Sequence, residues 1–168
     1  MLRMSLNEIR GKIQINPEYW INLYTTNCYA YALGLDLVES DICISAYQPG
    51  TISGVDSLGT KEYFTYNELI AGIESDLNIL MLNYKEVDFN YVVSENEWKI
   101  ALFIQNCSCD KLNDFHFLRT VNGGVWTHKD GFVGYPTKKD YLGHIIENPV
   151  DSFMCSYEYK KCYVLNKR

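Results

Sequence analysis

Apolar positions recur every three to four residues along the segment TYNELIAGIESDLNIL, which covers residues 65–80. Leu69, Ile73 and Leu77 fall at this spacing and would line one face of a helix. The segment opens with a threonine followed three positions later by a glutamate. This is the pattern of a capping box, in which each side chain satisfies a backbone N–H of the first turn. The pattern therefore predicts a helix over 65–80.

A second, shorter apolar run, CYAYAL, covers residues 28–33. Asn27 stands directly before it, and asparagine is among the residues that cap helix N-termini. Gly34 stands directly after it, and glycine commonly ends a helix because it adopts a left-handed backbone conformation without strain. The pattern predicts a short buried helix with Cys28 in its first turn.

Beyond the longer helix the chain takes on the composition of strands, rich in β-branched and aromatic residues. Strands are predicted at WKIALFIQ (98–105), at FHFLRTV (115–121) and VWTHK (125–129) around an Asn-Gly-Gly turn, and once or twice within SFMCSYEYKKCYVL (152–165). Helices followed by an antiparallel sheet make an α+β domain. Because no repeat or linker divides the chain, we expect a single domain over 1–168.

Composition narrows the classes of partner. The net charge is −6. Proteins that bind nucleic acid usually present a basic surface to the phosphates, so we expect no nucleic-acid partner. No run approaches the ~20 apolar residues of a membrane span, so we expect no membrane partner either. No secretory leader is visible, which predicts a soluble cytoplasmic protein, with delivery by a lysis system or a secretion apparatus as the other route. The oligomeric state stays open.

The six cysteines do not form a recognisable metal-binding pattern. Cys107 and Cys109 are spaced as one half of a zinc site, but a second pair at the usual spacing is missing, since Cys155 and Cys162 lie seven apart. We therefore expect neither a metal nor another cofactor. Without a leader, reduced thiols are the default state.

The residues that carry chemistry are Cys28, His116 and His128. A cysteine at a helix N-terminus is expected to have a lowered thiol pKa, because the helix dipole stabilises the thiolate. The two histidines lie in paired strands, and their even separation of about twelve positions is compatible with one shared face. One histidine can then take the thiol proton while the other orients it.

At this point the residues resemble a family. NCYAYALG, followed by two histidines twelve apart across a glycine-containing hairpin, is similar to the papain-like cysteine hydrolases of the NlpC type. The resemblance implies a papain-like fold, with Cys28 as nucleophile, His116 as base and His128 as the orienting residue. It further implies a thioester acyl-enzyme formed on an amide bond of a peptide, protein or peptidoglycan substrate.

The wording of the motif departs from that family. The sequence reads Asn-Cys-Tyr-Ala where the family usually has Asp-Cys-Ser-Gly, which leaves the substrate and the acyl acceptor open. DFHFLR and GGVWTHKDG also look like segments of an uncharacterised group of bacterial and phage-type proteins, a likeness that adds no function.

Several residues are candidates for the oxyanion hole or for substrate contacts. The backbone N–H of the nucleophile is the first donor for a developing oxyanion. Asn22 stands six residues upstream of the cysteine, where papain-like enzymes often have a glutamine, and Asn27 and Tyr24 are alternative donors. Arg119 could hold a substrate carboxylate, with a surface ion pair as its other interpretation.

Two further hypotheses use the same residues differently. Buried cysteines are common in cores, so a catalytically inactive papain-like protein that binds a host protein or a small ligand, of phage or effector type, is the main alternative to an enzyme. An aromatic cleft for a metabolite or nucleotide is the third hypothesis, although the chain has no glycine-rich phosphate-binding loop. His144 is expected to lie in a loop or at the surface.

Overall fold

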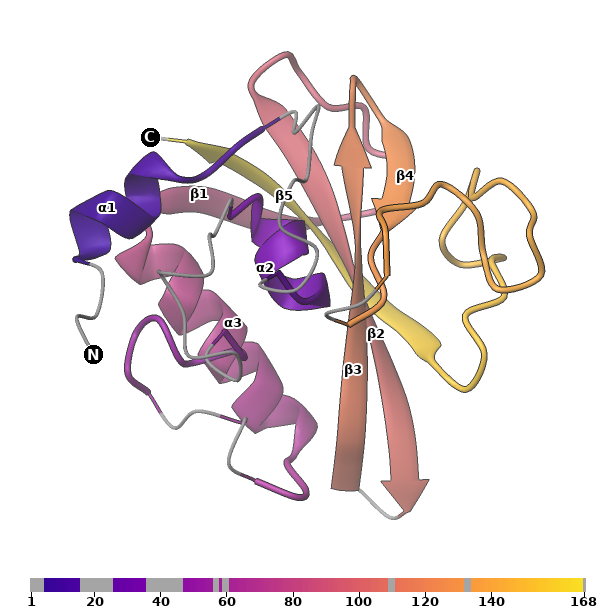
Figure 1. The fold of residues 1–168 in the computed structure, drawn as a ribbon, viewed down its shortest axis with the longest axis horizontal. Coiled ribbons are helices and arrows are strands. Elements are labelled where there is room, and N and C mark those ends of the chain that lie inside the picture. Colours follow the sequence, from indigo (N-terminus) through magenta and orange to yellow (C-terminus); the bar gives the residue numbers. More distant parts are fainter. Residues whose placement is uncertain are drawn as a thin grey trace.

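The computed structural model of the protein describes residues 5–15, 26–35, 47–55, 58, 61–108, 111–131 and 134–167, without the side chains of 106–108. The described residues fold into three helices and one antiparallel sheet (Figure 1). In chain order the elements are α1 (Leu6–Gly11), α2 (Cys28–Leu33), α3 (Tyr66–Ile79), β1 (Leu82–Val87), β2 (Glu97–Ser108), β3 (Lys111–Val121), β4 (Val125–His128) and β5 (Glu158–Lys167).

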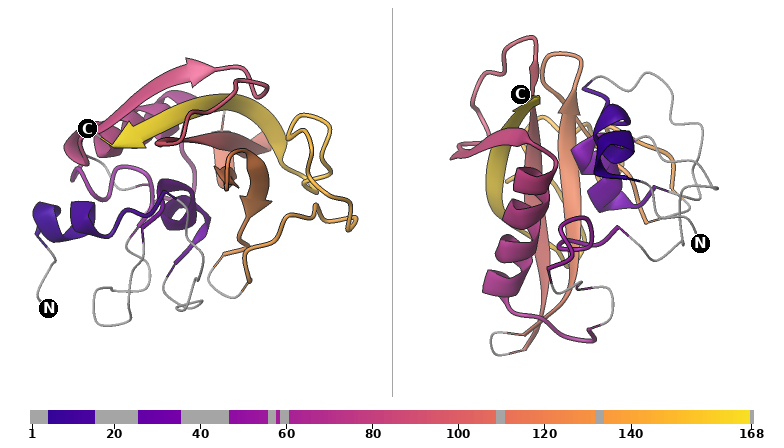
Figure 2. Two further views of the ribbon diagram at one scale, coloured as in Figure 1. Left: turned by 90° about the horizontal axis from the view of Figure 1, so that it is seen from above. Right: turned by 90° about the vertical axis from the view of Figure 1, so that its left-hand side faces the viewer.

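The strands are ordered β1-β5-β2-β3-β4 across the sheet, and each neighbouring pair is antiparallel. Helices precede all the strands in the chain, so the predicted α+β class is confirmed. Helices α1 and α2 lie on the same side of the sheet, as the left view of Figure 2 shows. Side chains of α3 join theirs in one apolar cluster, which places α3 on that side as well.

The longer predicted helix forms as α3, and its capping box is present between Thr65 and Glu68. Asp76 of this helix is buried and accepts hydrogen bonds from the Tyr29 hydroxyl and from two backbone N–H groups of the segment 47–55. A Cβ at Gly72 would meet the backbone of that segment at 2.9 Å, so the segment packs directly on α3. One carboxylate thus joins α2, α3 and a loop.

Two strand predictions need correction. No strand is predicted at 82–87, but β1 forms there as an edge strand paired with β5. Only Leu82 in it is buried, so its sequence shows no apolar alternation to detect. The predicted final segment 152–165 yields a single strand that begins later, at Glu158, because residues up to 157 belong to the connection from β4.

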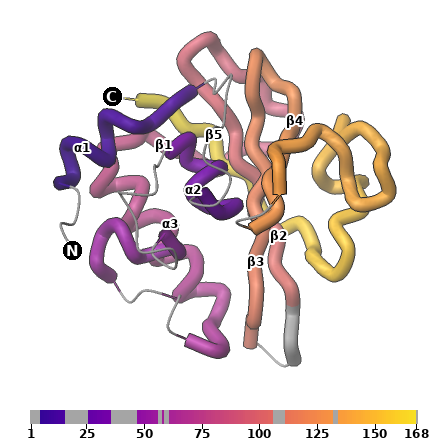
Figure 3. The backbone as a smooth tube through the Cα atoms, in the orientation of Figure 1, coloured from indigo at the N-terminus to yellow at the C-terminus, as the bar shows by residue number. Residues whose placement is uncertain are grey.

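Apolar side chains are buried on both faces of the sheet. The helical face is filled by Leu33, Leu69, Ile73, Leu102, Phe117 and their neighbours. The opposite face carries a smaller cluster: Ala101, Phe103, Leu118, Trp126, Ile146, Met154 and Cys162. Ile146 and Met154 come from the connection between β4 and β5, which runs beside the sheet (Figure 3) and covers part of this face. Within the described ranges, no helix combines the length and apolar character needed to cross a lipid bilayer.

Candidate functional site

Helix α2 forms as predicted and begins at Cys28. The Asn27 side chain accepts a hydrogen bond from the Ala30 N–H at 2.9 Å and caps the helix, while Gly34 ends it at φ 77°. All six helical residues are buried. A helix of this length is marginal by itself, so tertiary contacts must hold it in place.

Those contacts come from two donors beneath the helix. Arg119 Nη1 donates to the Tyr31 carbonyl at 3.0 Å, and Trp98 Nε1 donates to the Ala32 carbonyl at 3.1 Å. Both carbonyls belong to the last turn of α2, where the regular helical N–H partners are missing. The Tyr31 carbonyl also accepts a hydrogen bond from the Gly34 N–H at 2.9 Å. Arg119 Nη2 also donates to the Ile15 carbonyl at 2.6 Å, which ties the segment after α1 to the same point.

This arrangement corrects both interpretations of Arg119. The residue is 0% exposed, so it forms no surface ion pair. Its guanidinium is occupied by backbone carbonyls, so it is no substrate ligand in this structure. Arg119 instead fixes α2 against β3 and thereby positions Cys28. A Cβ at Gly34 would lie 2.8 Å from the same guanidinium, which is why glycine fits at the helix end.

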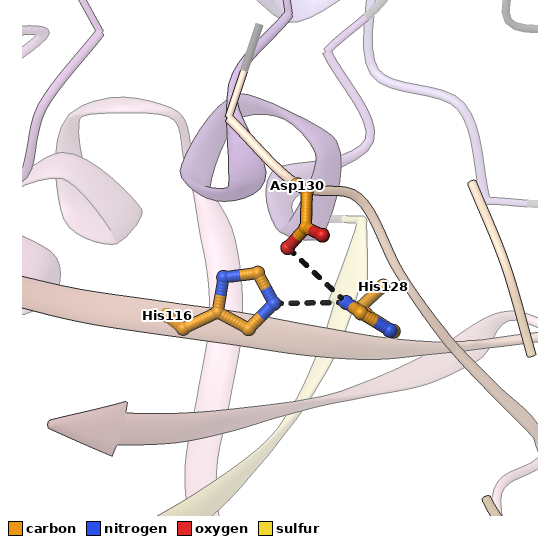
Figure 4. Close-up of side chains that lie close together, drawn as sticks. All are labelled: His116, His128 and Asp130. Carbon is orange, nitrogen blue, oxygen red and sulfur yellow. Dashed lines mark hydrogen bonds and ion pairs between the residues drawn. The ribbon is translucent and has the colours of Figure 1, made fainter. Parts of the chain in front are cut away.

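The two histidines meet on one face of the sheet, as their even separation suggested. His128 is the register partner of Leu118, and His116 lies two residues before Leu118 in β3. His116 Nε2 and His128 Nδ1 are 3.0 Å apart (Figure 4), a hydrogen bond between diagonal neighbours. Both rings are buried, His116 at 4% and His128 at 2% exposure.

Backbone chemistry fixes where the protons of this pair lie. His128 Nε2 is 2.8 Å from the Lys139 carbonyl, which can only accept, so Nε2 carries the proton. In the neutral ring, Nδ1 of His128 must then accept, and Nε2 of His116 must donate to it. Neutral His116 is left with a lone pair on Nδ1, the nitrogen a general base requires.

Cys28 approaches the histidine pair from the side of the sheet that the helices cover. The backbone groups of His128 bond to Thr137, on the side away from β3, and β4 ends there, one residue short of the position opposite Phe117. The N–H of Phe117 therefore faces an open edge, and it hydrogen-bonds to the Cys28 thiol. Cys28 and His116 line the same cavity of about 200 Å³ without a direct hydrogen bond between them.

The cavity carries two carboxylates. Its wall is made by Asn27, Cys28, Gln48, Asp114, Phe115, His116, Asp130, Gly131 and Tyr157. The Tyr157 hydroxyl donates to Asp114 at 2.5 Å, and the Tyr141 hydroxyl donates to Asp130. Asp130 Oδ1 lies 3.9 Å from His128 Nδ1. An imidazolium formed at the histidine pair would therefore meet negative charge.

The thiol is not acidified as the helix position predicted. Burial raises the pKa of Cys28 to about 12, with the charges of Asp114 and Asp130 acting in the same direction. Backbone hydrogen bonds from Phe117 and Tyr29 lower the pKa by less. Desolvation at 8% exposure outweighs the dipole of a six-residue helix, so the resting group is the thiol.

Burial acts on the histidine in the opposite sense. It lowers the pKa of His116, and the neighbouring His128 lowers it further, so the ring is neutral at physiological pH. Lys129, whose side chain is 0% exposed, donates to the Gly131 carbonyl at 2.7 Å. Burial lowers the pKa of Lys129 to about 8, while the charge of Asp130, and that of Cys28 once it is ionised, act in the opposite direction.

The remaining candidates divide into three groups. Asn27 lines the cavity, but its oxygen caps α2 and its Nδ2 donates to the Tyr47 carbonyl at 2.9 Å, which leaves one N–H for a substrate. Asn22 and Tyr24 lie outside the described residues. His144 is exposed in the connection after β4, as expected, with 75% of its side chain accessible.

The acidic and basic residues around the histidines were not among the predicted site residues. Asp114 lies within β3, two residues before His116, and Lys129 and Asp130 directly follow His128. That adjacency in the sequence was the available signal. The Lys139 carbonyl carries no sequence signal, because any residue supplies one. No family model, curated protein or solved structure matches this chain.

Proposed function

We propose that the protein is a cysteine hydrolase, a peptidase or amidase of papain-like fold, that acts through a Cys28–His116–His128 triad. The observation that carries the proposal is the ordered pair of histidines. The Lys139 carbonyl fixes the tautomer of His128, which orients His116 and leaves its Nδ1 lone pair available in the cavity that Cys28 lines.

In this mechanism the thiol proton passes to His116 Nδ1 as the Cys28 sulfur attacks the carbonyl carbon of an amide bond. The raised pKa of Cys28 favours transfer during the attack over a preformed ion pair. The imidazolium then gives its proton to the leaving amine, and a thioester remains on Cys28. Water hydrolyses the thioester by the same route in reverse.

Oxyanion stabilisation is proposed from the start of α2. The backbone N–H of Cys28 belongs to the first turn, where N–H groups lack intrahelical acceptors. Asn27 also lines the cavity, and the second N–H of its amide is the other candidate donor. The substrate class is an amide of a peptide, a protein or peptidoglycan, and hydrolysis, deamidation and transfer share the acyl-enzyme step.

The test measures alkylation of Cys28 by iodoacetamide at pH 7, followed residue by residue by mass spectrometry. We expect His116→Ala to slow the reaction about 10²-fold, since it removes the base. His128→Leu should slow it as well, whereas His128→Gln keeps an acceptor for His116 Nε2 and should restore part of the rate. His144→Ala is the matched control and should change nothing.

Buried Cys162, which has Lys99 and not a histidine as a charged neighbour, is the internal reference. If Cys28 is labelled no faster than Cys162, and His116→Ala leaves its rate unchanged in a folded protein, the triad is not assembled. With a substrate in hand, Cys28→Ala must abolish turnover and leave the urea unfolding curve in place.

A second function is favoured by the surface of the connection between β4 and β5. Large apolar side chains are exposed there at Tyr135, Leu142, Ile145, Val150 and Phe153. An exposed group of this kind is typical of a surface that binds another protein. A catalytically inactive binding protein would retain its partner after Cys28→Ala and lose it after substitution of Leu142 or Phe153.

A further inference from the structure

The histidine pair is also part of a group of metal-ligand atoms. His116, His128 and Asp130 each offer one such atom, and all three lie within 4.8 Å of one another. Figure 4 shows the side chains directed toward one point, two from neighbouring strands and one from the residues after β4. The nitrogen–nitrogen distance is 3.0 Å, and Asp130 Oδ1 lies 3.9 Å from His128 Nδ1.

These distances fit a divalent ion after small movements. Two ligands on a tetrahedral zinc ion with bonds of about 2.1 Å lie about 3.4 Å apart. The two measured distances fall on either side of that value. The carboxylate is half exposed, so it can approach the ion without disturbing buried packing.

The surroundings hold the ligands as metal sites do. Ligating histidines usually donate their second ring N–H to a backbone carbonyl, and His128 donates Nε2–H to the Lys139 carbonyl at 2.8 Å. This bond directs the Nδ1 lone pair into the group. Ligating carboxylates are usually hydrogen-bonded in turn, and Asp130 accepts from the Tyr141 hydroxyl. His116 and Asp130 both line the cavity, so water or a ligand can complete the coordination.

We propose that His116, His128 and Asp130 bind a divalent transition-metal ion, with Zn²⁺ the best match, and that the bound ion switches off the cysteine chemistry. Two imidazoles and one carboxylate with open positions suit zinc and its neighbours in the first transition row. Calcium and magnesium prefer ligand sets made of oxygen, which this site lacks.

The inhibitory part rests on the proposed function, whereas metal binding does not. In the triad, His116 carries its proton on Nε2 and accepts the thiol proton on Nδ1. A metal bound to Nε2 replaces that proton, and the neutral ring must then carry its hydrogen on Nδ1. The lone pair that would receive the Cys28 proton is no longer there.

The experiment titrates the full-length protein, stripped with a chelator, with Zn²⁺ by calorimetry and with Co²⁺ by visible absorption. We expect one equivalent to bind the Cys28→Ala and His144→Ala variants as it binds the wild type. Asp130→Asn keeps an acceptor for Tyr141 and should weaken binding by more than about tenfold, because loss of a partner of a ligand already weakens metal sites about 10- to 100-fold. His128→Ala should abolish binding, and His128→Gln serves if that variant does not fold.

Two results would overturn the metal site. Binding that is lost in Cys28→Ala, with a thiolate-to-cobalt charge-transfer band in the wild type, would assign the ion to cysteine. Binding unchanged in both Asp130→Asn and His128→Gln would place it elsewhere in the chain. Nitrogen-15 NMR of the imidazoles gives an independent readout, because metallation should shift His116 Nε2 and His128 Nδ1 and spare His144.

Inhibition is tested separately by alkylation of Cys28. We expect Zn²⁺ to slow the wild-type reaction in proportion to occupancy and to have little effect in Asp130→Asn at the same concentration. If Zn²⁺ binds at the three residues while the alkylation rate stays constant, the inhibitory part is wrong and the site remains. If Cys28 is inert without metal, the proposed function fails and the binding result still decides the site.

Discussion

The two halves of the candidate site are held in different ways. The Cys28 half is a fully buried helix, whose last turn is fixed by Arg119 and Trp98 and whose first turn is linked through Tyr29 to Asp76. The histidine half lies at the end of β4. There His128 depends on a backbone carbonyl of the connection between β4 and β5.

The difference separates two kinds of effect. Removing a contact on the helix half leaves buried polar groups without partners, which costs folding free energy. On the histidine half, the contact between Tyr141 and Asp130 is partly exposed, so water can replace it when it is removed and the cost in stability is smaller. Substitutions should therefore act mainly on unfolding in one half and mainly on reactivity in the other.

The largest expected effect on stability comes from Arg119→Met, which keeps the length of the side chain but removes its donors. Carbonyls of Tyr31 and Ile15 would lose a charged partner inside the core. We expect the free energy of unfolding in urea to fall by about 3–5 kcal/mol. Arg119→Lys is the control and should lose less. A loss below about 1 kcal/mol would contradict the anchoring role.

An intermediate effect is expected at Asp76, and it depends on pH. Burial raises the pKa of Asp76 above its ordinary value, so the folded protein holds the proton more tightly than the unfolded chain. The part of the stability that comes from this raised pKa is therefore complete below the unfolded pKa of ~3.9 and is lost as pH rises through the folded pKa.

Asp76→Asn tests this, because the amide does not titrate and offers one acceptor oxygen where the carboxylate offers two. The N–H of Gly50 or Ser53 would lose its partner, at a cost of about 1–3 kcal/mol at pH 7. Urea unfolding of both proteins from pH 4 to 8 should show the difference between them shrinking as pH rises. A difference that grows with pH would reverse the sign of the shift.

The smallest effect on stability is expected at Tyr141, on the histidine half. Tyr141→Phe removes one hydrogen bond to Asp130 at a partly exposed site. We expect a loss of less than about 1 kcal/mol in urea unfolding. A loss above about 2 kcal/mol would show that the connection contributes as much to stability as the helix half does, and the contrast between the halves would disappear.

Local patterns were enough to predict the parts of the fold that short-range chemistry determines. Asn27 and Gly34 define the ends of α2 because capping involves only neighbouring residues. The even separation of His116 and His128 was sufficient to place both rings on one face, since strand alternation has a period of two.

Other features depend on what packs against a residue, and sequence patterns do not carry that information. Arg119 appeared to be a surface or substrate residue because arginine is usually exposed, yet it lies beneath α2. The thiol pKa was predicted from the helix end alone, whereas burial decides its direction. Edge strand β1 has too few buried positions to produce an apolar pattern.

The backbone bridge between His128 and Thr137 affects whether the protein associates with other copies of itself. Strand β4 is an edge strand of the sheet, and unpaired N–H and C=O groups on an edge strand can pair with a strand of another molecule. Thr137 exchanges both backbone hydrogen bonds with His128 and so occupies that edge beside the histidines. A deletion or insertion between His128 and Thr137 would expose the unpaired backbone groups of β4. Self-association by strand pairing would then begin at the candidate site.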